Sequence, residues 1–348
     1  MEYEKLIKKY DSSNMLARID EFLDEFQKAY SMGYNFAVPK EFIGARNVVG
    51  LGMGGSGMAY TILSNISRNF GTASIEVIPD YNLPPYVGKE TAVFVTSFSG
   101  NTEETLSAAE QARQKGCAII CISTGGKLVE WAKKHNIATV QFSYPVVPRV
   151  GLPYTLGIVL GLFCKAGFIK PETDNLSMLV SAAITDVRKE WSNNDFKKEA
   201  QEIVEKIENK MVFMVGSGLS YSIAVRWKGQ LNENAKSIAF VEQMPEMCHN
   251  MYLGYKNPDA VLKKSAVIFL DSHLDHPQNR KRVLLVGDEF KKSGVTIIHP
   301  NLDNIKSTFG VLLAQLLLGD YVSYYLALKN NEDPLEMERI ENLKKKLI

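Results

Sequence analysis

Short apolar runs rich in Val and Ile recur along this chain and alternate with segments of helical periodicity. In the first half the runs are NVVGLGM, SIEVIPD, TAVFVTS, CAIICIST and IATVQFS, and helical patterns such as GMAYTILSNISRNF and KLVEWAKKHN lie between them. Continuous apolar strands separated by helices are typical of a parallel sheet that is covered on both faces. We therefore expect a doubly wound α/β fold.

The second half of the chain repeats this order. Its expected strands are MVFMVGSGLS, SIAFVEQ, SAVIFLD and VTIIHP, and two helices follow the last of them. The openings VVGLGMGGSGMA and VFMVGSGLSYSIA are alike, which indicates an internal duplication. We expect an N-terminal helical segment (1–46), a first α/β domain (47–170) and a second (176–348) with the C-terminal helices. Each domain should have three αβα layers, and KPETDN should link them.

The composition excludes several classes of protein. With 45% apolar and 23% charged residues among 348, the chain is globular, and its net charge of +1 gives no general attraction to nucleic acid. The N-terminus is charged and does not resemble a signal peptide. The cysteines (Cys117, Cys121, Cys164 and Cys248) do not have metal-ligand spacing. We expect a reduced, cytoplasmic protein.

Two long apolar stretches raise the question of a membrane span. TLGIVLGLF is too short to span a bilayer, and GVLLAQLLLGDYVSYYLAL is interrupted by Gln315 and Asp320. We expect both to be buried helices, either within the core of one chain or at a subunit interface.

The stretch SFSGNTEETL (97–106) stands between an expected strand and an expected helix. Its Ser, Asn and Thr residues suit helix capping. They also suit a phosphate site, because hydroxyls and free N–H groups at a helix N-terminus bind anions. The stretch alone leaves both explanations open. Its counterpart in the second half reads DSHLDHP, so a phosphate site is expected in the first half only.

The glycine-rich stretch GLGMGGSGMA fits the spacing G-x-G-x-x-G of dinucleotide-binding proteins. The acidic residue that should follow about 20 residues later is a poor match, because Asp80 lies nearer 30 residues on. What the stretch supplies is Ser56 and free N–H groups at a second helix N-terminus. In a parallel sheet this loop shares an edge with SFSGNT. Together they favour the phosphate of a small metabolite.

GMGGSGMA and SFSGNTEET resemble the sugar isomerase (SIS) domain family, and VPRVGLPYTLG resembles its phosphoglucose/phosphomannose isomerase branch. NENAK, EMCHN and DPLEMERIENLK are similar to further segments of that branch, in order from about residue 47 to the end. The resemblance implies a homodimer of carbohydrate metabolism, active in glycolysis and gluconeogenesis. Such an enzyme interconverts glucose 6-phosphate, and mannose 6-phosphate, with fructose 6-phosphate without metal or organic cofactor.

The resemblance also implies the roles of particular residues. Those expected to bind substrate are Gly54, Gly55, Ser56, Ser97, Ser99 and Thr102. Those expected to act on it are Arg149 facing the reacting carbons, Glu233 as base, His249 as ring-opening residue from the neighbouring subunit, and Lys344 as a further sugar contact.

The chemistry of isomerisation calls for the same kinds of side chain. Proton transfer between C1 and C2 needs a carboxylate such as Glu233, which takes the proton and returns it. The enediolate that forms is negative, and a guanidinium such as Arg149 stabilises it. Hexose phosphates are mostly ring-closed, and an imidazole such as that of His249 suits the proton transfer that opens the ring.

Taken singly, these residues have simpler explanations. Glu233 would be a solvated carboxylate at a polar helix end, His249 a buried structural histidine, and Lys344 a cation that suits a helix C-terminus. A metal site in DSHLDHP is imaginable, but capping of the next helix by Asp275, with Pro277 in its first turn, explains more of that stretch.

The sequence departs from the branch at two places. A threonine and a second proline often follow the Asp-Pro of the last segment, whereas this chain has Leu335 and Glu336, in a region that bears on mannose 6-phosphate. Cys248 stands where an asparagine often precedes the histidine. Two alternatives stay open: an amino-sugar isomerase or deaminase of the same fold, and a non-catalytic phosphosugar-binding regulator.

Overall fold

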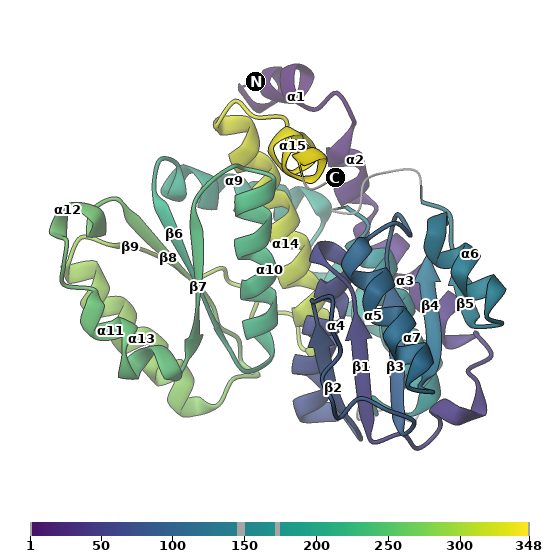
Figure 1. Ribbon diagram of the computed structural model, residues 1–348. Coiled ribbons are helices and arrows are strands. Elements are labelled where there is room, and N and C mark those ends of the chain that lie inside the picture. The colour runs from purple at the N-terminus through teal and green to yellow at the C-terminus, as the bar shows by residue number, and fades with distance from the viewer. Residues whose placement is uncertain (1, 145–149, 171–174, 347–348) are drawn as a thin grey trace. The chain divides into compact units, whose positions relative to one another are not determined.

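The computed structural model describes residues 2–144, 150–170 and 175–346, and the chain divides into two compact domains (Figure 1). The first domain is Phe22–Ala182. The second domain combines Met1–Glu21 with Ala183–Ile348. This division differs from the expected separate segment 1–46, because the first 21 residues belong to the second domain and the rest to the first. Most of the expected linker, residues 171–174, lies outside the described residues.

The described residues of the first domain form five strands and the helices that connect them. Its described elements are α3 (Phe22–Tyr34), η1 (Lys40–Phe42), β1 (Asn47–Leu51), α4 (Gly54–Phe70), β2 (Ser74–Ile78), β3 (Thr91–Thr96), α5 (Glu103–Gln114), β4 (Ala118–Ser123), α6 (Gly126–Lys134), β5 (Ala138–Gln141), α7 (Leu152–Ala166) and η2 (Leu176–Met178). All five strands expected in this half are confirmed.

The strands of the first domain form a parallel sheet in the order β2-β1-β3-β4-β5. Both faces are covered, as alternate residues of the fully buried strand β3 illustrate. Val93 and Val95 belong to the core cluster that includes residues of α5 and α6. Phe94 faces the other way and packs edge-on against Phe163 of α7, with ring centroids 4.7 Å apart. The expected three-layer α/β domain is thereby confirmed.

Helix α7 is the buried helix that TLGIVLGLF predicts. It packs closely along α3, because small residues let the two backbones approach. A Cβ atom at Gly161 would lie 2.4 Å from the carbonyl oxygen of Tyr30, so only glycine fits there. The apolar face of α7 is therefore used within the chain.

The second domain has four strands among its described residues. Its elements are α1 (Glu2–Tyr10), α2 (Met15–Asp20), α8 (Leu179–Glu190, which begins in the first domain), α9 (Asn193–Ile207), β6 (Met211–Ser217), η3 (Gly218–Ser220), α10 (Tyr221–Glu233), β7 (Ala239–Met244), η4 (Glu246–His249), α11 (Met251–Gly254), α12 (Asp259–Leu262), β8 (Ser265–Leu270), α13 (Pro277–Lys292), β9 (Thr296–Ile298), α14 (Thr308–Lys329) and α15 (Glu338–Lys346). The sheet order β7-β6-β8-β9 is parallel and repeats that of β2-β1-β3-β4, which supports the expected duplication.

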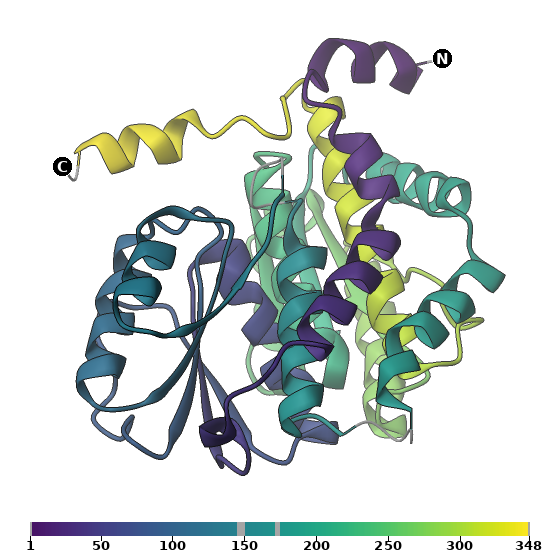
Figure 2. The same ribbon diagram turned by 90° about the vertical axis from the view of Figure 1, so that its right-hand side faces the viewer.

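Helix α14 is the central helix of the second domain. It is long and apolar enough to cross a membrane, yet its apolar window is entirely buried in the protein, as expected for a core helix. The N-terminal residues pack against it: Tyr324 donates a hydrogen bond of 2.8 Å to Asp11, and Tyr321 one of 2.5 Å to Asp20. Figure 2 shows the N-terminal helices alongside α14. These contacts explain why residues 1–21 belong to this domain.

Candidate active site

The two loops singled out in the first domain meet at the carboxyl edge of its sheet. One follows β1 and the other follows β3, and the strand order reverses between these neighbouring strands. Ligands of open α/β sheets bind outside the strands at this kind of reversal. The loops are in contact, since the backbone N–H of Phe98 donates to Ser56 Oγ at 3.3 Å.

Three hydroxyl groups of SFSGNT gather at this edge. Ser97 Oγ and Thr102 Oγ1 lie 3.0 Å apart, and the buried Ser97 supports the half-buried Thr102. Ser99 is exposed, and its Oγ accepts the N–H of Asn101 at 3.3 Å. The tight turn needs glycine at position 100, where φ is +70° and a Cβ would overlap Gly125.

The N-termini of α4 and α5 have no side-chain caps. Met53 and Thr102 precede these helices, and neither side chain accepts a capping hydrogen bond within the described residues. Thr102 therefore does not serve as the cap that its sequence position suggests. By contrast, Ser192 and Ser307 cap α9 and α14. The first N–H groups of a helix have no acceptor one turn earlier, so those of Gly54 and Gly55 and those at the start of α5 are available to an anion. The N–H of Ser56 instead donates to the carbonyl oxygen of Met53 at 3.1 Å. The segment from Gly54 to Ser56 and residues 97–102 together are called the cradle below.

Glu233 is the last residue of α10, in the second domain, and it is partly buried rather than a fully solvated carboxylate. Helix α10 is held to α14 by buried polar contacts: Arg226 Nη2 lies 3.5 Å from Asp320 Oδ1, to which Gln230 also donates. Burial raises the pKa of Asp320, against the lowering effect of Arg226. Next to Glu233, the buried Asn234 donates to Ser323 Oγ at 3.0 Å. This network fixes the end of the helix that carries Glu233.

His249 ends η4, directly after β7, and it is exposed. The alternative of a buried structural histidine is therefore wrong. Helix α10 runs from the carboxyl edge of the sheet to the amino edge, and β7 runs back to the carboxyl edge. Glu233 and His249 thus lie at opposite edges, on the order of 15–20 Å apart, from the lengths of a 13-residue helix and a six-residue strand. One copy of the second domain does not bring them together.

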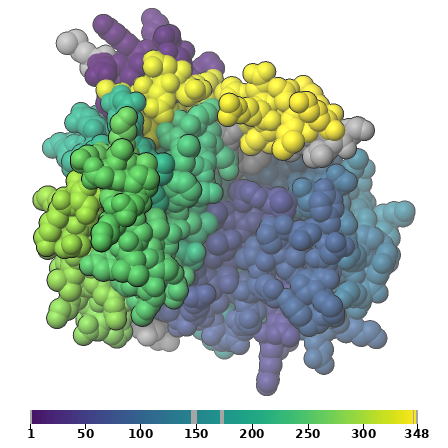
Figure 3. Space-filling view, turned by 60° about the vertical axis from the view of Figure 1, so that its left-hand side comes forward, coloured from purple at the N-terminus to yellow at the C-terminus, as the bar shows by residue number. Residues whose placement is uncertain are grey.

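The structure does not describe the side chains of two expected site residues. Arg149 lies outside the described residues. Lys344 belongs to α15, although its side chain is outside the described part of the structure. Helix α15 (yellow) is at the surface in Figure 3. Its residue Leu343 is exposed. The departure at Leu335 and Glu336 precedes this helix.

Lys236 connects the segment just before Leu335 and Glu336 to the C-terminal end of α10, the helix that carries Glu233. Lys236 Nζ donates to the carbonyl oxygen of Asp333 at 2.5 Å and to that of Asn234 at 3.3 Å. Asp333 in turn accepts the N–H of Leu335 at 2.8 Å. Changes at positions 335 and 336 therefore act next to the C-terminus of α10.

The structure of the stretch DSHLDHP differs in one respect from the prediction that Asp275 caps the next helix. Pro277 begins α13 as expected, but the cap is His276, whose Nδ1 accepts the N–H of Gln278 at 3.2 Å. Asp275 turns back instead, and its Oδ2 accepts the N–H of Ser272 at 2.9 Å. Among the described residues, no group of three or more His, Cys, Asp or Glu side chains is placed to hold a metal ion.

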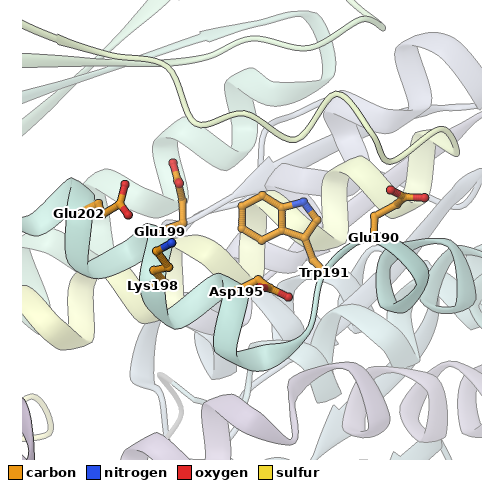
Figure 4. Close-up of a pocket in the computed structure, with 6 residues that line it drawn as sticks. All are labelled: Glu190, Trp191, Asp195, Lys198, Glu199 and Glu202. Carbon is orange, nitrogen blue, oxygen red and sulfur yellow. The ribbon is translucent and has the colours of Figure 1, made fainter.

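Two hollows elsewhere compare poorly with the cradle as phosphate sites. One, in the second domain, has a volume of about 380 Å³ (Figure 4) and is lined by Glu190, Trp191, Asp195, Lys198, Glu199 and Glu202. Its carboxylates would repel a phosphate, and burial with the charge of Glu202 raises the pKa of Glu199. The other, of about 460 Å³ in the first domain, contains Arg46, Lys165 and Lys170. It lies at the C-terminus of α7, where backbone carbonyls disfavour an anion.

The fold and the cradle define a class, that of proteins with two SIS domains. The family model "SIS domain" matches residues 41–159, and "Bacterial phospho-glucose isomerase C-terminal SIS domain" matches 196–347. The C-terminal domain of glucosamine-fructose-6-phosphate aminotransferase from Francisella tularensis has a similar fold, with a TM-score of 0.71, 13% identity, and coverage of 91% of this chain and 96% of that one.

Curated relatives narrow the class further. A bifunctional phosphoglucose/phosphomannose isomerase of Caldicellulosiruptor bescii is 36% identical over 93% of this chain and 96% of its own length. That of Aquifex aeolicus is 32% identical over 89% of this chain and 93% of its own. The chain belongs to the bifunctional phosphoglucose/phosphomannose isomerase family, and it is a phosphosugar isomerase.

Proposed function

We propose that the enzyme interconverts glucose 6-phosphate and mannose 6-phosphate with fructose 6-phosphate through an enediolate. The observation that carries this proposal, beyond family membership, is the cradle: two uncapped helix N-termini joined by the contact between Phe98 and Ser56, with three hydroxyls beside them. A phosphate there accepts hydrogen bonds from N–H and O–H donors, and it benefits from both helix dipoles.

The proton transfers need side chains from outside the cradle. Glu233 is proposed as the base that moves the proton between C1 and C2, with Arg149 stabilising the enediolate and Lys344 contacting the sugar. The contacts of Arg226, Gln230 and Asn234 with α14 support this role, because a base must be held in position to act on carbon.

His249 is proposed to open the sugar ring in the site of a neighbouring subunit. Two observations support this: His249 is exposed, and it lies at the opposite sheet edge from Glu233. A homodimer in which each copy lends His249 to the other explains both. Of the two alternatives for α7 and α14, core helix or subunit interface, the burial of their apolar residues within the chain supports the core helix. We place the enzyme in the cytoplasm.

Mannose 6-phosphate requires that the enediolate accept a proton at C2 from either face. The hydrogen bond from Lys236 to the carbonyl oxygen of Asp333 places positions 335 and 336 next to the helix that carries the proposed base. We propose that Leu335 and Glu336 set the ratio of the two aldose products.

The test is a coupled assay with EDTA present, which offers fructose 6-phosphate and follows glucose 6-phosphate and mannose 6-phosphate separately. Both products are expected. Glucose 6-phosphate alone would remove the mannose half of the proposal. With neither product formed, the proposal is wrong, and turnover of glucosamine 6-phosphate would then select the amino-sugar alternative.

A further inference from the structure

The second domain contains a structural copy of the cradle turns. Gly54 and Gly218 occupy the same position after β1 and β6, with φ of +51° and +48°. Two residues before each lies a glycine that packs on the following helix. A Cβ at Gly52 would lie 3.1 Å from the N atom of Gly57, and one at Gly216 would lie 2.4 Å from Cα of Tyr221. The two turns thus place their glycines at equivalent positions, although Gly54 begins α4 whereas Gly218 begins the 3-10 helix η3.

The loops that face these turns are equivalent too. Six residues, 97–102, separate β3 from α5, and six residues, 271–276, separate β8 from α13. Strands β3 and β8 also end in the same register. Val95 pairs with Leu51, so Thr96 lies opposite Gly52, and Leu270 pairs with Gly216, the equivalent of Gly52. Asn101 and Asp275 therefore hold the same place in their loops.

These two residues point in different directions. The side chain of Asn101 lies between its own loop and α6: its Oδ1 accepts the N–H of Lys127 at 3.2 Å, and its Nδ2 donates to the carbonyl oxygen of Ser99 at 3.1 Å. Asp275 turns inward over the glycine turn, and the residue is 7% exposed. A Cβ at Gly218 would lie 3.1 Å from Asp275 Oδ1, whereas one at Gly54 would meet no heavy atom within 4 Å. The space over the turn is open in the first domain and filled by a carboxylate in the second.

The carboxylate uses the kinds of donor that a bound phosphate would use. It accepts the backbone N–H of Ser272 at 2.9 Å. Burial raises the pKa of Asp275, and the neighbouring Ser217 hydroxyl, which accepts from Asn279 at 3.0 Å, opposes this effect. Ser217 is itself 2% exposed. Arg280, in the first turn of α13, adds an attractive charge. A carboxylate and a phosphate oxygen are alike as hydrogen-bond acceptors.

We propose that Asp275 is a built-in anion that occupies the second domain's copy of the phosphate cradle, so that each chain has one phosphosugar site instead of two. The inference rests on the proposed role of the cradle in the first domain. It implies that removal of the carboxylate exposes a latent site for inorganic phosphate or a phosphate monoester.

The test compares the full-length wild type with Asp275→Gly, using radiolabelled inorganic phosphate in equilibrium dialysis at constant ionic strength. The variant is expected to bind one more phosphate per chain than the wild type. Asp271→Gly is the matched control, because Asp271 is in the same loop and pairs with His299 at the surface. The control should bind the same number as the wild type. An unchanged number for Asp275→Gly overturns the proposal.

A second measurement covers a variant that folds poorly. If phosphate replaces the missing carboxylate, it should raise the Tm of Asp275→Gly, or of the milder Asp275→Ser, by more than it raises the Tm of the wild type. Equal shifts overturn the proposal.

Two substitutions in the cradle of the first domain distinguish a failure of this inference about Asp275 from a failure of the proposed function. The extra phosphate site should persist when Ser97→Ala and Ser99→Ala are combined with Asp275→Gly. Loss of the extra site in that background would mean that Asp275 acts on the first cradle, and it would overturn the inference. The isomerase assay of the wild type, by contrast, decides the proposed function alone.

Discussion

The two sheets share a strand order but differ in what lies at their carboxyl edges. In the first domain the reversal point between β1 and β3 carries hydroxyls, N–H groups and open space over Gly54. In the second domain the equivalent point between β6 and β8 is filled by Asp275, and the proposed base stands at the far end of α10. The comparison teaches that two copies of one fold can differ at equivalent sheet edges, so that the proposed anion site and the proposed base can belong to different copies.

The largest expected effect comes from the proposed base. Glu233→Gln should lower kcat by roughly 10²–10⁴-fold, since it removes the general base but keeps the shape of the side chain. Binding of fructose 6-phosphate should persist, because the cradle that we propose for the phosphate belongs to the first domain. Steady-state kinetics and calorimetric titration measure the two effects. Glu289→Gln, which changes an exposed carboxylate on α13, is the control. Near-normal turnover of Glu233→Gln would show that Glu233 is not the base, and that the second domain does not supply the proton-transfer group through this residue.

A mixing experiment tests whether His249 acts in the neighbouring subunit. Glu233→Gln and His249→Ala homodimers should each be nearly inactive. After the two are unfolded and refolded together, roughly a quarter of wild-type activity should return, because random pairing in a two-fold dimer gives half heterodimers with one complete site each. Refolding of each variant by itself is the control. Activity that stays at the level of the separate variants would place both residues in one chain's site.

A smaller effect is expected in the cradle itself. Ser99→Ala removes one hydroxyl from an exposed position, so KM for fructose 6-phosphate should rise about 10-fold, the low end for loss of one hydrogen bond to a charged group, with kcat little changed. Lys170→Ala changes the basic hollow at the C-terminus of α7 and should leave KM unchanged. If Lys170→Ala raised KM and Ser99→Ala did not, the phosphate would belong to that hollow.

The smallest effect concerns the pH dependence of folding. Burial raises the pKa of Asp275 to about 6 from an ordinary 3.8. Its ionised form is thus disfavoured in the folded state, so the folded state gains stability relative to the unfolded state as pH falls from about 6 towards 4. Between pH 7 and 5 the wild type should gain on the order of 1 kcal/mol relative to Asp275→Asn in urea unfolding.

The control for this measurement is Asp195→Asn. Ser192 lowers the pKa of Asp195, so the contribution of that carboxylate stays constant between pH 7 and 5 and is lost only at lower pH. Parallel pH profiles for the wild type and Asp275→Asn would show that the Asp275 carboxylate is not strained by burial, and they would weaken the contrast between the two sheet edges.

The sequence by itself determined the nine described strands, the duplication and the meeting of GMGGSG with SFSGNT. Apolar runs specify buried parallel strands, and the ends of neighbouring parallel strands must share an edge. The sequence also indicated that the phosphate site belongs to the first half, because DSHLDHP does not repeat SFSGNT.

Only the tertiary structure decided where the remaining groups point. Residues 1–21 join the second domain because Tyr321 and Tyr324 of α14 bond to them from 300 residues or more away in the sequence. Thr102 is of a residue type that often caps helices, but its side chain does not cap α5. Asp275 accepts the N–H of Ser272 in its own loop, whereas the equivalent Asn101 accepts the N–H of Lys127 on α6. The direction of a polar side chain depends on the donors and the space that distant segments supply, and local sequence does not contain this information.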